Sequence, residues 1–198
     1  MKEEFVKYYQ QYITREGGKE LLEYLEKSDF FTAPASTRFH GDHRGGLCEH
    51  SVNVFKHLVR LASTYKKELG VEKWEQKAES IAICSLLHDL CKIGCYKVDM
   101  RNRKNEQGVW EKYPAYSFDE QEPMGFHGPK SARVIERYIK LTDEEWVAIA
   151  THMGAWDRNP GDPSLNSVYD EPKYRLSVLL SIADEFATYF DETKKNEA

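Results

Sequence analysis

The residues that decide the fold read Ile-Ala-Ile-Cys-Ser-Leu-Leu-His-Asp-Leu, from Ile81 to Leu90. Apolar side chains fill nearly every position, so they would point to almost all sides of a helix that we expect over 74–90. Such a helix belongs at the centre of a helical domain, where every side is buried. The stretch ends on His88 and Asp89, two polar residues in a place where a core is expected.

Amphipathic patterns around this segment predict a mostly α-helical chain. Apolar residues at steps of three and four indicate a long helix over 47–69. Thr142 and Glu145 have the spacing of a capping box at the start of another helix. The remaining helices are expected over 3–15, 19–27, 129–140, 142–154 and 172–189, and a loop is expected over 30–46.

One segment departs from the helical pattern, between residues 96 and 118. Polar and apolar residues alternate over 96–100 and 109–113, on either side of Asn105-Glu-Gln-Gly108. This arrangement predicts a β-hairpin. We therefore expect an all-α domain with a small β-hairpin insert, and a connection this long in a compact domain is more often functional than idle.

Length and composition restrict the class of protein. The 198 residues suit a single domain, with N-terminal helices over 1–30 and a frayed tail over 193–198. A formal net charge of −5 argues against broad, phosphate-driven DNA binding. No apolar run is long enough to span a bilayer, and the first residues lack a signal-peptide pattern. The four cysteines form no CxxC pair, which favours a reduced, cytoplasmic protein.

Polar residues interrupt several of the apolar helical stripes. His50 leads the stripe of the long helix, His152 closes a helix, and Asp184 follows Leu179-Leu-Ser-Ile-Ala. An unpaired buried carboxylate is costly, so Asp89 and Asp184 need a compensating charge. One histidine on a helix is ordinarily a core or surface residue, but several such positions share these apolar helices. A divalent cation held by imidazole and carboxylate groups from different helices would compensate them together.

The ordered set of His50, His88-Asp89 and Asp184 resembles the HD superfamily of metal-dependent phosphohydrolases. The local contexts are similar too: Gly45-Gly-Leu-Cys-Glu-His50-Ser51, Leu86-Leu-His-Asp-Leu-Cys-Lys-Ile-Gly94 and Ile182-Ala-Asp184. The resemblance covers residues 38–190 and implies an HD-domain helical bundle. It also implies a metal ion held by His50, His88, Asp89 and Asp184.

Two further histidines resemble those of family members that hold two metals. By that resemblance Asp89 would bridge to a second ion held by His127 and His152; alternatively, both histidines contact substrate phosphate. The implied cofactor is one or two divalent ions, of manganese, iron, magnesium, cobalt, nickel or zinc. The same ligand order resembles HD-fold di-iron oxygenases, whereas the GYP element of the HD-GYP phosphodiesterases is absent.

The implied reaction is hydrolysis of a phosphomonoester or phosphodiester. A bound cation lowers the pKa of its water and neutralises charge on the phosphoryl oxygens. Besides Asp89, we expect a catalytic role for Lys92, one helical turn past His88, whose ammonium would meet phosphate or else pair with Asp89. Lys130 and Ser131, in the first turn of the helix after His127, would bind the substrate anion or else cap the helix.

The hairpin insert is expected to shape substrate choice, unless it is a solvated element packed by its own aromatic rings. It carries basic and aromatic side chains: Arg101, Arg103, Lys104, Trp110, Tyr113 and Tyr116. Cations bind phosphates and aromatic faces stack on bases, which suits a nucleotide or a short single-stranded nucleic acid. The acidic total favours the small phosphate ester as partner. A di-iron oxygenase and a non-catalytic nucleotide-binding module are the alternative functions.

Overall fold

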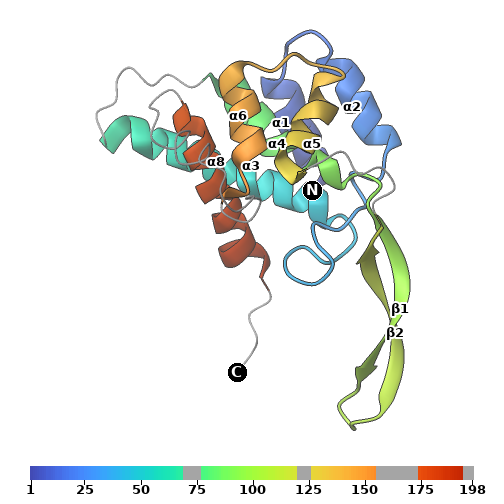
Figure 1. Cartoon of the computed structure of the whole chain (residues 1–198). Coiled ribbons are helices and arrows are strands. Elements are labelled where there is room, and N and C mark those ends of the chain that lie inside the picture. The colour runs from blue at the N-terminus through green and yellow to red at the C-terminus, as the bar shows by residue number, and fades with distance from the viewer. Residues whose placement is uncertain (69–76, 120–125, 155–173, 194–198) are drawn as a thin grey trace.

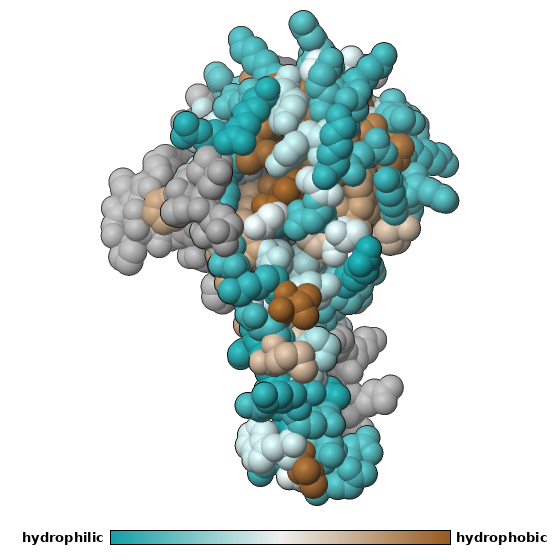
Figure 2. All heavy atoms as spheres, turned by 90° about the vertical axis from the view of Figure 1, so that its right-hand side faces the viewer, coloured by the Kyte–Doolittle hydropathy of each residue, from teal (hydrophilic) through white to brown (hydrophobic). Residues whose placement is uncertain are grey.

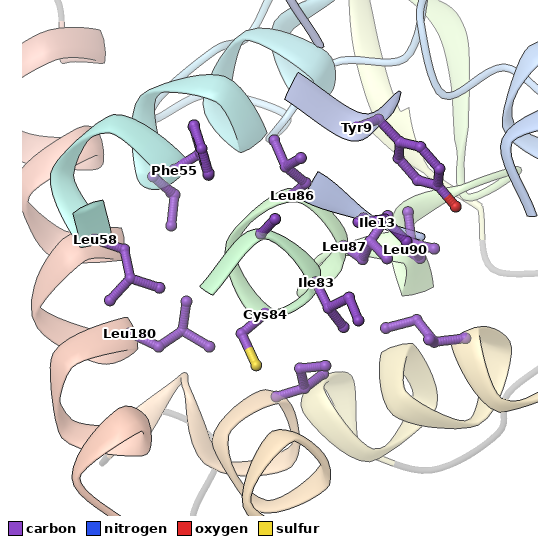
Figure 3. Packing of buried hydrophobic residues seen from close by; sticks show 14 of the residues in the cluster. Tyr9, Ile13, Phe55, Leu58, Ile83, Cys84, Leu86, Leu87, Leu90 and Leu180 are labelled. Carbon is purple, nitrogen blue, oxygen red and sulfur yellow. The ribbon is translucent and has the colours of Figure 1, made fainter. Parts of the chain in front are cut away.

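The computed structural model describes residues 1–68, 77–119, 126–154 and 174–193. Its centre is α4 (Ala78–Leu87), the helix that the sequence predicted to be buried on all sides. Seven of the ten residues of α4 are buried. Figure 3 shows Ile83, Cys84 and Leu86 pointing away from α4 in different directions, each towards another helix. The first residues of the predicted helix, 74–76, lie outside the described part of the chain.

The helices around α4 form a bundle, which confirms the all-α class (Figure 1). They are α1 (Lys2–Tyr12), α2 (Gly18–Lys27), α3 (Gly46–Glu68), α5 (His127–Glu136), α6 (Asp143–Thr151) and α8 (Arg175–Phe186). Of these, α1, α3, α6 and α8 contact α4 directly, and α5 packs against α6. In the described ranges, no helix combines the length and the apolar character needed to cross a membrane.

The helix ends differ from the predicted ones by a few residues. The α5 helix begins at His127, two residues before the predicted start, and ends at Glu136. The capping box of α6 is confirmed, with Thr142 Oγ1 accepting from the Glu145 backbone N–H at 3.3 Å. A π-helical segment, η4 (Ala187–Glu192), continues α8 beyond its predicted end. The predicted start of α8 at residue 172 lies outside the described residues.

The predicted hairpin is confirmed, although both strands are longer than the alternating patterns. Strands β1 (Tyr96–Lys104) and β2 (Trp110–Phe118) pair antiparallel, with Tyr96 opposite Phe118. The hairpin stands away from the helical bundle in both views, and its face in Figure 2 is mostly hydrophilic. At its base, the Tyr96 hydroxyl donates to the Ala35 carbonyl at 3.2 Å.

An ion pair between a half-buried arginine and a buried carboxylate joins the segment after α1 to α4 and α6. The Glu145 carboxylate of α6 accepts hydrogen bonds from both Nη atoms of Arg15, at 2.8 and 2.9 Å, and from Ser80 Oγ at 2.7 Å. It also accepts from the backbone N–H of Thr142. Burial raises the pKa of Glu145, but these donors outweigh burial and lower the pKa below its ordinary value.

Replacing Arg15 with alanine should destabilise the fold by about 3 kcal/mol at pH 7, because Glu145 would keep a buried charge without its partner. Since the folded-state pKa of Glu145 is lowered, its contribution is present above the ordinary carboxyl pKa of 4.5. That contribution is lost as the pH falls through the folded-state pKa. Urea unfolding of the wild type and of Arg15→Ala at pH 7 and pH 3 measures both effects.

The matched control removes an exposed ion pair instead. Lys27→Ala breaks the pair of Lys27 with Glu23, and should change the free energy of unfolding by less than about 0.5 kcal/mol. Equal stability of Arg15→Ala and the wild type at pH 7 would contradict the role given to this ion pair.

Candidate metal centre

The six ligands implied by the resemblance converge at one place, where the ends of several helices meet. His50 lies in the first turns of α3, His88 caps the C-terminus of α4, and His152 caps the C-terminus of α6. His127 opens α5, and Asp184 lies on α8. The side chains nearest the core are fully buried: His50, His88, Asp89 and His152.

A first group of ligand atoms surrounds Nε2 of His50. This atom lies 3.1 Å from Asp184 Oδ1, 3.2 Å from His88 Nε2 and 3.6 Å from Asp89 Oδ2. His88 Nε2 is also 3.6 Å from Asp89 Oδ2. Two imidazole nitrogens and two carboxylates therefore face a common point, which is the donor set of a divalent metal site.

A second group faces the other oxygen of Asp89. Oδ1 lies 2.5 Å from His127 Nε2 and 3.7 Å from His152 Nε2. The two oxygens of one carboxylate thus point to two different pairs of histidines. This is the arrangement in which a carboxylate can bridge two cations.

The buried imidazoles are oriented by hydrogen bonds at their outer nitrogens. His88 Nδ1 donates to the Ser85 carbonyl at 2.8 Å, and His152 Nδ1 donates to the Ile149 carbonyl at 2.6 Å. Because a carbonyl only accepts, each ring presents an unprotonated Nε2 to the centre when it is neutral. In the described ranges, Nε2 of His152 is buried and has no hydrogen-bond partner. An orphaned buried nitrogen among carboxylates fits a metal ligand.

The charges of the centre are strongly coupled. Burial lowers the pKa of His50, but Glu192 and Asp184 outweigh it and raise that pKa to about 10. Burial lowers the pKa of His88 to about 3, so this ring is neutral. Burial raises the pKa of Asp89, but the nearby cationic side chains lower it well below its usual range. A divalent cation could replace the proton that His50 places beside Asp184, because metal ligands bind in their deprotonated form.

Sequence reasoning missed the residue that orients His50. Glu192, in the last turn of η4, accepts from His50 Nδ1 at 3.0 Å and from Asn53 Nδ2 at 3.0 Å. Its side chain is 3% exposed. The predicted helix ended at residue 189, so nothing in the apolar pattern marked Glu192 as an inward-facing residue. Residues 194–198 of the predicted frayed tail lie outside the described residues.

Two further side chains lie beside the centre. His40 has its ring 5.0 Å from that of His50. Cys91 has its Sγ 3.3 Å from Nδ1 of His127. Histidine and cysteine in a loop or short turn carry no periodicity, so the sequence gives no sign of which side they face.

A close approach of two helices places His127 beside His152. A Cβ atom added to Gly128 would lie 2.4 Å from the carbonyl oxygen of Ala150. Only glycine therefore allows the N-terminus of α5 to rest against the C-terminus of α6. The two imidazole rings come within 5.5 Å of each other as a result.

Lys92 lies at the centre, but not on a continuation of α4. The helix ends at Leu87, and Lys92 closes the short 3₁₀ turn η1 (Leu90–Lys92). Its Nζ lies 2.7 Å from Asp89 Oδ2, so the ion pair weighed as an alternative is present. Burial lowers the pKa of Lys92, but the negative charge of Asp89 raises it by more. The pKa therefore lies above its ordinary value, and the side chain stays charged.

A cavity of about 670 Å³ opens over the centre. Asp89, Lys92, His152 and Asp184 line it on the side of the metal ligands. Residues of the loop before α3, of η4 and just after η4 line it elsewhere: Arg38, Phe39, His40, Asp42, Thr188, Tyr189 and Thr193. A cavity of this size with a few convergent polar groups is typical of a small-molecule site.

The remaining candidate substrate residues do not line this cavity. Lys130 and Ser131 are buried: Lys130 Nζ lies 3.8 Å from Cys95 Sγ, and Ser131 Oγ accepts from the Cys91 backbone N–H at 3.1 Å. On the hairpin, Arg101 donates to the carbonyl of Tyr116 at 2.8 Å. Arg103 pairs with Glu111 at 2.6 Å and covers the Tyr113 ring.

Comparisons with known proteins agree with the motifs. The family model of the HD domain matches residues 47–189. Over 138 residues the chain is 28% identical to a dihydroneopterin 2′,3′-cyclic phosphate phosphodiesterase of Methanocaldococcus jannaschii, a match that covers 69% of this chain and 47% of that protein. The chain thus spans about half the length of this relative. No solved structure matches the chain at a significant level.

The family match extends over most of the chain and includes all six converging side chains, from His50 to Asp184. The fold is the helical one that the resemblance implied, and the hairpin is an insert within the matched range. These findings agree with one another at the level of motif and fold. The chain therefore belongs to the HD-domain family, the superfamily of metal-dependent phosphohydrolases.

Proposed function

We propose that this chain hydrolyses a phosphomonoester or phosphodiester bond of a small molecule, with two divalent cations in the candidate centre. The observation that carries the proposal is the position of Asp89, whose Oδ2 faces His50 and His88 while Oδ1 faces His127 and His152. A structural ion pair would need one cationic partner, not two separate sets of nitrogens.

Different residues of the centre would bind the cations and the substrate. Bound cations would lower the pKa of a water molecule and neutralise charge on the phosphoryl oxygens. Asp89, Asp184 and the four histidines supply the ligands. Lys92 contributes a fixed positive charge at the cavity floor, which would attract and orient the phosphoryl group. The surrounding apolar core keeps these charges in a low dielectric, where each interaction is stronger.

A nucleotide is the substrate class that we favour. The relative from Methanocaldococcus jannaschii is named for a 2′,3′-cyclic phosphate, a phosphodiester of a small heterocyclic compound. The cavity volume suits a molecule of that size. A short single-stranded nucleic acid is less favoured, because the net charge of −5 opposes binding of a polyanion.

A di-iron oxygenase remains the second candidate function, because the bridging position of Asp89 would serve two iron ions as well. Metal analysis of protein purified without chelator, combined with a phosphatase screen and an oxygen-uptake assay, separates the two. Hydrolysis supported by manganese, magnesium or zinc without oxygen uptake supports the phosphohydrolase. Native iron with oxygen consumption and no hydrolysis would overturn it.

We expect about two metal equivalents in the wild type and none in Asp89→Ala, which removes the bridging ligand. His127→Ala and His152→Ala should each lose about one equivalent, because both belong to the second group. Mass spectrometry of the purified variants measures the metal content. Asp99→Ala, which changes an exposed carboxylate of the hairpin, should keep both equivalents. Full metal content in a folded Asp89→Ala protein would refute the ligand assignment.

Lys92→Ala should keep the metal and lower kcat on the order of 100-fold, because a positive charge next to the phosphoryl group disappears. Steady-state kinetics and metal analysis on the same preparation separate the two effects. Lys97→Ala, on the hairpin, removes an exposed lysine that pairs with Asp119 and should leave kcat unchanged. An unchanged kcat in Lys92→Ala would exclude Lys92 from the reaction.

Glu192→Gln should weaken metal binding by about 10- to 100-fold, because a carboxylate that accepts from a ligating imidazole fixes and strengthens that ligand. Competition with a chromophoric chelator measures the affinity. The control is the neighbouring Asp191→Asn, since Asp191 accepts from His57 Nε2 at 2.7 Å, away from the centre. Equal metal affinity in Glu192→Gln and the wild type would show that Glu192 does not act on His50.

A further inference from the structure

Two large aromatic side chains stand exposed at the edge of the cavity. Phe39 is 77% exposed and Tyr189 is 61% exposed, and both line the cavity over the metal centre. Both side chains leave most of their surface in contact with solvent, so they contribute little to the core. When such rings border a cavity with a charged floor, they are candidates for ligand contact.

The two rings are carried by segments that the fold joins together. Ser36 Oγ accepts from the Phe39 backbone N–H at 2.9 Å and donates to the His40 carbonyl at 2.7 Å, which fixes a tight turn around Phe39. Tyr189 lies in η4, and an antiparallel bridge pairs His40 with Thr193, just beyond η4. Phe39 and Tyr189 are therefore positioned at one opening before any ligand binds.

Among the described residues, the cavity lining holds two cationic side chains and four carboxylates, so a phosphate ester would suit it once cations occupy the candidate ligands. Lys92 lines the cavity beside Asp89, and Arg38, next to Phe39, lines it as well. A ligand that reaches the floor with its phosphate would leave its remaining atoms near the opening. An aromatic face binds planar rings by stacking, and does so for any heterocyclic base.

The hairpin offers a weaker place for a base. Its Trp110 ring is covered by Lys104, with Nζ 5.5 Å from the ring centroid, and its Tyr113 ring is covered by Arg103 at 4.9 Å. Neither aromatic residue lines the cavity. The stacking surface that the sequence suggested on the hairpin is thus not the one at the metal centre.

We propose that Phe39 and Tyr189 form the binding site for the planar heterocyclic base of a nucleotide whose phosphate reaches Asp89 and Lys92. The inference rests on the proposed phosphohydrolase function for the position of the phosphate, and it adds the base as the feature that selects the substrate. Affinity should therefore depend on the base as well as on the phosphate.

The test compares ligands with and without a base on metal-loaded protein. The ligands are the 5′-monophosphates of adenosine, guanosine, cytidine and uridine, with ribose 5-phosphate as the base-free ligand. Affinity is measured as KM where the ester is cleaved and as Kd by calorimetry where it is not. In Phe39→Leu and in Tyr189→Leu we expect at least one nucleotide to bind roughly 5- to 100-fold more weakly, and ribose 5-phosphate to bind as before.

Two control variants match the tested ones. Phe190→Leu changes a ring that is 73% exposed and adjacent to Tyr189, but does not line the cavity, so it should leave nucleotide affinity unchanged. Trp110→Leu removes an aromatic ring of the hairpin and should also leave nucleotide affinity unchanged. Circular dichroism and metal content confirm that each variant is folded and loaded.

The outcomes separate this inference from the proposed function. Nucleotide binding that depends on Phe39 and Tyr189 without any hydrolysis would support the base site and contradict the phosphohydrolase. Hydrolysis that neither substitution changes would support the phosphohydrolase and contradict the base site. The inference is also overturned if no nucleotide binds more tightly than ribose 5-phosphate, or if Trp110→Leu alone weakens nucleotide binding.

Discussion

The structure depends on the cost of burying the carboxylate of Asp89 in an apolar bundle. Every side of α4 packs against another helix, so its C-terminal end delivers Asp89 into the core. A carboxylate in that position needs positive charge from elsewhere. Lys92 supplies part of it, and the histidines that converge from three other helices create a place where divalent cations can supply the rest. The positive charge that would compensate Asp89 would therefore also form the catalytic centre that we propose.

The same kind of hydrogen bond orients two of the proposed ligands. His88 and His152 each cap a helix C-terminus and donate from Nδ1 to the carbonyl three residues earlier, Ser85 and Ile149. A helix C-terminus leaves carbonyl groups without backbone partners, so these bonds satisfy the helix ends. They also fix each ring with Nε2 towards the centre. The ends of α4 and α6 are thus stabilised by the same contacts that orient two of the proposed metal ligands.

The sequence predicts the parts of this arrangement that leave a mark on local pattern. An apolar helix without a polar face has to be buried, so the central position of α4 was predictable. A charged residue at the end of such a helix needs a compensating charge, so the need of Asp89 for cationic partners was predictable as well. Glu192 was not, because it faces inward only through the π-helical turn that follows α8. Nor was the burial of Lys130, since a helix start that could bind anions looks the same in sequence whether it faces a cavity or the core.

The metal centre and the cavity opening differ in how they relate to the family. All six converging ligands lie within residues 47–189, the range that the HD family model matches. Phe39 and His40 lie before that range, Glu192 lies after it, and Tyr189 is its last residue. Of these residues, Glu192 contacts a candidate ligand, because it accepts from His50 Nδ1 at 3.0 Å, so a change there would disturb the centre. Family membership indicates the class of reaction, whereas in the base site that we propose the choice of substrate would depend on the loop before α3 and the turn after α8.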